Sequence, residues 1–158
     1  MARNYTFQFA SSCTASSTIA LGYIFNITAI NQFRIYDILS GSDASPIDQA
    51  AKFQLVRAST TGNTLTVGSA FGINPADPVP TAFVYTNPSN PGGTSPTMTG
   101  PSSLLTWAQN QRATFRWVAA PEREIYSTIG SIQNGFGTIT PVISGSNWNC
   151  VLTEEFTE

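Results

Sequence analysis

The residues of this chain that can do acid–base chemistry are its nine carboxylates, because the sequence contains no histidine. They are Asp37, Asp43, Asp48, Asp77, Glu122, Glu124, Glu154, Glu155 and Glu158. Glycoside hydrolysis needs two carboxylates that face each other across a sugar. No spacing in the sequence singles out such a pair, so the favoured interpretation is solvated surface charge.

A calcium site is the second chemistry that these carboxylates suggest. Asp37, Asp43 and Asp48 lie around the sequence Ser40-Gly41-Ser42. A calcium-binding loop needs acidic ligands at alternate positions and a bidentate glutamate at its end, and this segment has neither. We therefore expect no metal site and no cofactor.

Nucleophilic catalysis lacks a base in this sequence. Without histidine there is no Ser-His-Asp or Cys-His arrangement and no His-ligated metal. Lys52 is the only other base to consider, and it has no S-x-x-K context. Neither G-x-x-x-x-G-K nor G-x-G-x-x-G, the phosphate-binding patterns, occurs. The sequence predicts a protein that is not an enzyme.

The two cysteines, Cys13 and Cys150, lie near opposite ends of the chain. Two cysteines cannot complete a structural zinc site by themselves. The favoured interpretation is a pair of reduced, partly buried thiols in a reducing cytosol, and the alternative is a disulfide between a first and a last strand.

The charge and hydropathy of the chain limit the classes of partner that it could bind. Charged residues make up 10% of the sequence and the net charge is −2, which argues against a nucleic-acid-binding protein held by phosphate contacts. No run of 18 apolar residues is present, so we expect no membrane span. Hydrophobic residues make up 41%, enough for a core.

The elements that position these residues follow a period of two, which is typical of strands. The predicted strands are 5–9, 19–27, 33–39, 53–57, 65–67, 83–85, 114–118, 125–129, 137–143 and 148–156. Evidence for helix is limited to one possible turn at 48–52 and to 103–109, which fits helix or strand. These short strands predict an all-β, single-domain antiparallel β-sandwich over residues 1–158, similar to a jelly roll.

One segment, residues 74–101, contains seven of the ten prolines. Proline has no amide donor for a sheet ladder, so we expect a long surface loop here. Long loops often make functional contacts, although an insertion without a function is the alternative. The charged cluster at 121–124 is a second predicted contact, with a solvated turn as its alternative. The candidate interface residues are Asn74, Pro88, Pro91, Pro96, Pro101, Pro121, Glu122, Arg123 and Glu124.

Three tryptophans, Trp107, Trp117 and Trp148, allow a different interpretation. β-Sandwiches that bind sugars use exposed aromatic rings flanked by amides, and Trp148 lies between Asn147 and Asn149. The favoured interpretation is that the tryptophans belong to the core or to a subunit interface. The alternative sugar-contact set is Trp107, Trp148, Asn147 and Asn149.

The order of these features resembles that of small all-β proteins encoded among the virion genes of tailed bacteriophages, including capsid decoration or cement proteins. The resemblance covers the layout of the whole chain and rests on short motifs. They are Asp48-Gln49, the strand that ends in residues 55–62, the Pro-rich segment, residues 117–124 after an aromatic strand, and the closing strand at 152–156.

This resemblance implies a non-enzymatic virion structural protein that binds the assembled phage head. Its partners would be the major capsid protein or other virion subunits. It also implies a homo-oligomer, with a trimer favoured, that is made in the host cytoplasm and located in the virion. A carbohydrate-binding β-sandwich module, or another self-assembling capsid, tail or fibre subunit, remains the alternative.

Overall fold

The computed structural model describes residues 2–13, 19–26, 32–42, 46–59, 66–86, 97–127, 134–140 and 148–158. These residues form strands and no helix. The strands are β1 (Asn4–Cys13), β2 (Ile19–Asn26), β3 (Arg34–Ser42), β4 (Ala50–Ser59), β5 (Thr66–Val67), β6 (Ala70–Gly72), β7 (Ala82–Thr86), β8 (Thr97–Asn110), β9 (Phe115–Val118), β10 (Ile125–Tyr126), β11 (Asn134–Thr140) and β12 (Trp148–Thr157).

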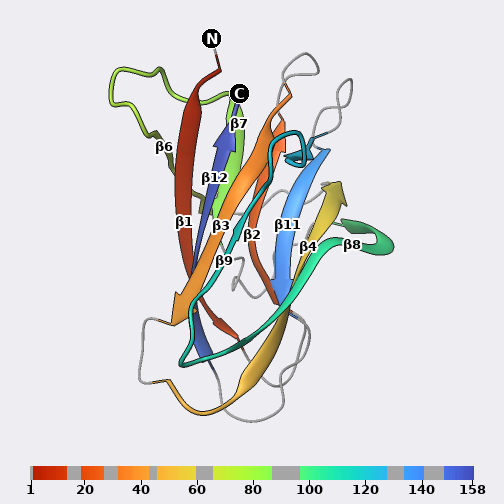
Figure 1. The fold of residues 1–158 in the computed structure, drawn as a ribbon. Coiled ribbons are helices and arrows are strands. Elements are labelled where there is room, and N and C mark those ends of the chain that lie inside the picture. Colours follow the sequence, from red (N-terminus) through yellow and green to blue (C-terminus); the bar gives the residue numbers. More distant parts are fainter. Residues whose placement is uncertain are drawn as a thin grey trace.

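Two antiparallel sheets pack face to face (Figure 1). Sheet A has the strand order β10-β3-β12-β1-β6, and β9 also pairs with β3. Sheet B has the order β5-β7-β2-β11-β4-β8. The prediction of an all-β sandwich is confirmed, whereas the jelly-roll topology and the single domain stay predictions. Among the described residues, no helix could span a lipid bilayer.

Alternation of side chains explains why β1 is a strand of this sandwich. Tyr5, Phe7 and Phe9 are buried, whereas the intervening Gln8 is exposed. Tyr5 pairs in register with Phe156 of β12, and their rings stack with centroids 5.3 Å apart. Burying such a side chain stabilises the fold by about 2 kcal/mol. The apolar face of β1 therefore packs into the core between the sheets.

Close contact between the sheets requires a glycine in β2. A Cβ atom on Gly22 would lie 2.6 Å from the ring of Phe9, which projects from sheet A. Further along the core, the ring of Phe33 meets that of Phe136 edge to face at 5.6 Å. The core is therefore an aromatic layer between the two sheets.

The prediction of one continuous loop over residues 74–101 is wrong. Residues 82–86 form β7, which pairs with β2, and the side chains of Ala82 and Val84 are buried in the core. The prolines flank this segment and leave its alternating pattern intact, so it enters the sheet. Residues 74–81 do connect strands at the surface, and 87–96 lie outside the described residues.

Pro101 also lies in a strand, but in a position that proline tolerates. β8 is the edge strand of sheet B, and its pairing with β4 shifts register between Met98 and Ser103. Residues 99–102 therefore bulge out of the ladder, where a missing amide donor costs little.

The two segments with possible helical character are strands. The possible turn at 48–52 is wrong in its second half, because Ala50 to Lys52 begin β4 and pair with β8. The segment 103–109, which fitted helix or strand, lies within β8. Pairing between these two strands overrides the weak local preference of both segments.

The cysteines lie on neighbouring strands. Cys150 is buried on the core face of β12 and pairs in register with Ser11, whereas Cys13 pairs with Trp148. The two positions are thus offset by two residues along the ladder. Because the side chain of Cys13 lies outside the described residues, the thiol interpretation and the disulfide alternative both stay predictions.

Candidate functional site

One end of the sandwich gathers both ends of the chain, the 73–81 connection and the 119–127 segment (Figure 1). We call it the terminal end. The amide of Arg3 donates to the carbonyl of Glu158 at 3.0 Å, and the amide of Glu158 donates back at 3.1 Å. The amide of Ile73 donates to the carbonyl of Asn4 at 2.9 Å. Long-range backbone bonds therefore fix the connecting segments on this end.

The carboxylate of Glu158 joins the two sheets at the terminal end. Its Oε2 accepts from the amide and the hydroxyl of Thr81 at 2.9 and 3.1 Å, and its Oε1 accepts from the amide of Ala82 at 2.6 Å. Glu158 follows β12 of sheet A, whereas Ala82 begins β7 of sheet B. Both carboxylate oxygens accept hydrogen bonds, so this side chain satisfies three donors of the 81–82 segment.

Replacement of Glu158 by glutamine is expected to lower the free energy of unfolding by about 1–2 kcal/mol. The amide nitrogen of glutamine is a donor and cannot accept from the amide of Ala82 or Thr81. Urea denaturation measures the effect, with Glu122→Gln, at an exposed position, as the control. Equal midpoints for the two variants would contradict the assigned role of Glu158.

The predicted charged cluster forms a turn on the terminal end. Pro121, Glu122 and Arg123 are exposed, and Glu122 has a φ of 65°, in the left-handed region. Glu124 is half-buried and turns toward the sheet, where its Oε1 lies 3.6 Å from Nη1 of Arg34. The cluster is thus anchored to β3 at one side and exposed at the other.

Beside this turn lies a depression of about 360 Å³, which we call the Arg34 basin. It is lined by Asn4, Arg34, Tyr36, Ala119, Pro121, Glu124 and Thr157. A second depression of about 220 Å³ shares Arg34 and Thr157 with it and is also lined by Tyr126. The basin contains both donors and acceptors, which suits a polar ligand.

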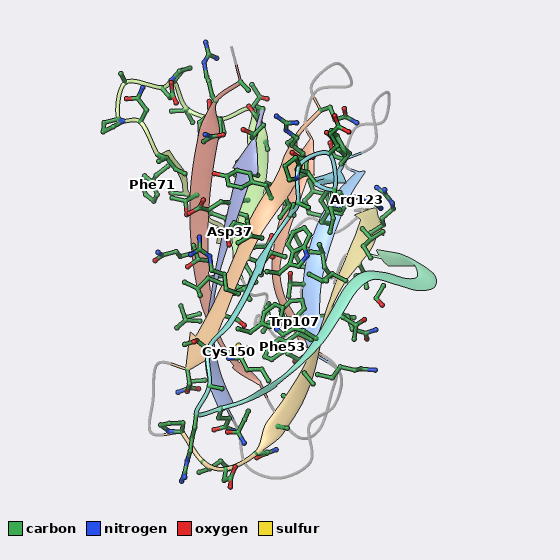
Figure 2. The ribbon with its side chains drawn as sticks, in the orientation of Figure 1. Asp37, Phe53, Phe71, Trp107, Arg123 and Cys150 are labelled. Carbon is green, nitrogen blue, oxygen red and sulfur yellow. The ribbon has the colours of Figure 1, made fainter. Side chains whose placement is uncertain are left out.

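An apolar groove of about 350 Å³, the β6–β7 groove, lies at the edge of the sandwich. Its lining consists of Gly68, Ser69, Ala70, Phe71, Val79, Pro80, Ala82 and Val84. Phe71 is 66% exposed, Val79 is 85% exposed and the neighbouring Ile73 is 49% exposed. Figure 2 shows Phe71 directed away from the sheets at the margin of the molecule.

These two surfaces differ in chemistry, one being apolar and the other polar. Comparison with protein families, curated proteins and solved structures gives no match.

The predicted interface residues are divided among three places. Asn74 is exposed near the β6–β7 groove, and its Oδ1 accepts from the amide of Ala76 at 3.1 Å. The 121–124 turn borders the Arg34 basin. Pro88, Pro91 and Pro96 lie outside the described residues, and of Pro101 only the backbone is described. The structure thus brings Asn74 and the charged turn to the same end of the sandwich.

The prediction of Trp107 as a sugar contact is wrong, because its side chain is only 5% exposed. Its ring stacks between those of Phe53 and Phe115, at centroid distances of 5.3 and 5.0 Å (Figure 2). Trp107 is on the inward face of β8, where packing uses the whole ring. Its favoured interpretation as a core residue is confirmed.

The rest of the sugar-contact set stays a prediction. Asn149 is exposed, and its carbonyl accepts from the hydroxyl of Ser42 at 3.1 Å. Trp148 pairs with Cys13 in the sheet, but its side chain and all of Asn147 lie outside the described residues.

Two carboxylates predicted to be solvated are buried. Asp37 is paired with Arg116, whose Nη2 lies 2.5 Å from Oδ2. Glu154 is 2% exposed on the core face of β12, and the hydroxyl of Thr138 in the opposite sheet donates to its Oε1 at 2.6 Å. Burial raises the pKa of Glu154 to about 7. The alternation of Leu152, Glu154 and Phe156 in the sequence was the signal that could have placed Glu154 inside.

The other acidic residues form no metal site in the described part of the chain. The described ranges contain no group of three carboxylate or cysteine residues that could hold a metal ion. Asp48 is exposed and accepts from Nδ2 of Asn110 at 2.6 Å, and Asp43 lies outside those ranges.

Proposed function

We propose that this chain is a non-enzymatic structural protein that docks on a protein lattice, and specifically a capsid decoration protein of a tailed bacteriophage. The observation that carries the proposal is the β6–β7 groove with its exposed rim. Phe71 and Val79 expose large apolar side chains on this concave surface, and Ile73, two residues after Phe71, is also exposed. Contiguous exposed apolar surface is characteristic of protein–protein contact sites.

The energetics of the groove favour contact by shape and burial. Burying apolar surface contributes about 25 cal/mol per Å², and an aromatic residue such as Phe71 is the type that anchors an interface. The chain carries only 10% charged residues. Affinity on such a surface depends on apolar area and fit, with a small contribution from long-range electrostatics.

The fold gives this groove a fixed shape before a partner arrives. Its two walls come from β6 of sheet A and β7 of sheet B, and Glu158 bonds the start of β7 to sheet A. A preorganised site loses less conformational entropy on binding. Repetition of the same contact over a shell of identical subunits further raises the effective affinity.

The choice of a phage capsid as the lattice rests on the layout of the sequence, which resembles that of phage head-surface proteins. On this proposal the partner is the major capsid protein, and the decorating unit is a homo-oligomer such as a trimer. The rigid all-β sandwich and its exposed apolar rim suit that role.

The double variant Phe71→Ser/Val79→Ser is expected to bind assembled, undecorated phage heads at least tenfold more weakly than the wild type. Both side chains are mostly exposed, so their loss removes contact area without opening the core. Co-sedimentation of the protein with heads at increasing concentration measures the affinity.

The matched control is Leu104→Ser. Leu104 is 39% exposed on β8, at the opposite edge of sheet B from β5 and β7. We expect this variant to bind heads as the wild type does. Binding by the double variant equal to that by the control would remove the groove from the contact surface, and failure of the wild type to bind heads would refute decoration.

A further inference from the structure

A row of four polar residues crosses sheet A at the terminal end. Asn4 of β1 pairs with Thr157 of β12, Thr157 pairs with Arg34 of β3, and Arg34 pairs with Tyr126 of β10. The next residues along these strands, such as Tyr5, Phe156 and Ile35, are buried in the core. Because side chains alternate along a strand, the four polar side chains lie together on the outer face of the sheet.

The row is completed by groups from the 119–124 segment and β3. Glu124 reaches Arg34, and Pro121 and Ala119 border the same depression. Tyr36 forms a further wall, and burial, together with a hydrogen bond to Glu155, raises the pKa of its phenol. The Arg34 basin therefore combines an aromatic wall with donors and acceptors that belong to three strands and to the 119–124 segment.

The polar contacts among Arg34, Tyr126 and Glu124 are long. Nη1 of Arg34 donates to the hydroxyl of Tyr126 at 3.3 Å, and this hydroxyl donates to Oε2 of Glu124 at 3.4 Å. The ion pair between Arg34 and Glu124 spans 3.6 Å. Charge-assisted hydrogen bonds are ordinarily about 2.8 Å long. A ligand hydroxyl placed among these groups would replace long contacts by shorter ones.

The charges that line the Arg34 basin balance: Arg34 is its one cation and Glu124 its one carboxylate, and the two are paired. Beside the basin, Glu155 bonds to Tyr36, and Arg57 donates to the carbonyl of Tyr126 at 3.3 Å. A phosphate or carboxylate would have to displace Glu124 from Arg34 and would then meet its negative charge. A neutral ligand that both donates and accepts hydrogen bonds meets no such penalty.

We propose that the Arg34 basin binds a neutral saccharide. Adjacent hydroxyls of a sugar ring donate to Glu124 and accept from Arg34, and the Nδ2 group of Asn4 donates at the opposite side. The amide of Asn4 is oriented by Thr157, whose hydroxyl donates to its Oδ1. The ring of Tyr36 and Pro121 cover the apolar face of the sugar. This site is separate from the sugar-contact set predicted from the sequence and from the β6–β7 groove.

The test is saturation-transfer NMR of the whole chain with the methyl glycosides of glucose, galactose, mannose and N-acetylglucosamine, and with sialic acid and glucose 6-phosphate as anionic probes. We expect saturation of at least one neutral glycoside at millimolar concentration and none of either anion. Saturation of the anionic probes alone, or of no probe, would overturn the proposal.

Two conservative variants locate the site. Glu124→Gln replaces an acceptor of the proposed site by an amide donor, and Tyr126→Phe removes the hydroxyl that bonds Arg34 and Glu124 beside it. Both keep the size of the side chain, and we expect at least tenfold weaker binding by each. Glu122→Gln, on the same turn with an exposed side chain, serves as the matched control and should bind as the wild type does. Phe71→Ser should also bind the sugar as the wild type does, because the β6–β7 groove is a separate surface. Urea midpoints confirm that the variants are folded, and unchanged binding by both site variants would refute the assignment.

Discussion

Replacement of Gly135 by alanine is expected to prevent the chain from folding. A Cβ atom at this position would lie 1.8 Å from the carbonyl oxygen of Ile24 and 2.8 Å from its carbonyl carbon. Both are backbone atoms of β2, the neighbouring strand in the sheet. Side-chain rotation cannot relieve such an overlap, so the strands must separate.

The position of β11 makes this separation costly. β11 lies between β2 and β4, and Gly135 pairs with Phe25 on one side and with Ala58 on the other. Moving β11 away from β2 breaks the ladder at the centre of sheet B. We expect a loss of more than about 4 kcal/mol, a large share of the 5–15 kcal/mol that holds a typical domain folded.

The matched control is Gly41→Ala in β3. The nearest heavy atom to a Cβ there is Cγ2 of Thr114, at 3.8 Å, which is an ordinary van der Waals contact. Far-UV circular dichroism and urea denaturation should therefore give a midpoint near that of the wild type for Gly41→Ala and no cooperative transition for Gly135→Ala. A cooperative transition of Gly135→Ala at the wild-type midpoint would show that β11 and β2 are not in such close contact.

The strands could be predicted from the sequence wherever one face of a strand is buried. In β1, the alternation of Tyr5, Phe7 and Phe9 is set by burial of one side of the sheet, and the period of two records it directly. The pattern weakens where a strand is very short or irregular. β6 has three residues and was not predicted from the sequence. The bulge around Pro101 interrupts β8, of which only residues 103–109 were identified, as helix or strand.

The surfaces were less accessible to prediction, because they depend on which strands are neighbours. Asn4, Arg34, Tyr126 and Thr157 are far apart in the chain, and only the antiparallel pairing of four strands places them in one row. Sequence periodicity gives the face of each residue but not the order of the strands. The charged turn at 121–124 was identified by composition alone, and its anchoring partner Arg34 was not.

The burial of Trp107 could not be decided from the sequence. Its residue type fits both an exposed sugar platform and the favoured core residue. The distinction depends on two rings that pack against it, Phe53 of the neighbouring strand β4 and Phe115 of β9 in the other sheet. In contrast, Glu154 lay at a core position of a clear alternating pattern. The general rule that carboxylates are exposed outweighed the local pattern, and the local pattern was correct.

The burial of Glu154 predicts that its carboxyl group destabilises the fold as the pH rises. Its pKa is about 7 in the folded chain against an ordinary value of 4.5, so the folded state binds the proton more tightly than the unfolded state does. The contribution of this group to stability is complete below pH 4.5 and is lost as the pH rises to about 7. The free energy of unfolding falls by about 3 kcal/mol over this pH range because of this group.

Glu154→Gln is therefore expected to be more stable than the wild type above pH 7, by about 2–3 kcal/mol, and equal to it near pH 4. Glutamine keeps the shape of the side chain and can still accept from the hydroxyl of Thr138, but it never becomes charged. Urea denaturation from pH 4 to 9 measures the difference between the two proteins, and Glu155→Gln, one residue along β12 on the outer face, is the control.

Thr138→Val should shift the loss of stability to higher pH, because it removes the hydrogen bond that lowers the pKa of Glu154. A difference between Glu154→Gln and the wild type that does not change with pH would mean that the carboxyl group has the same pKa in the folded and the unfolded chain, and hence that water reaches the space between the sheets.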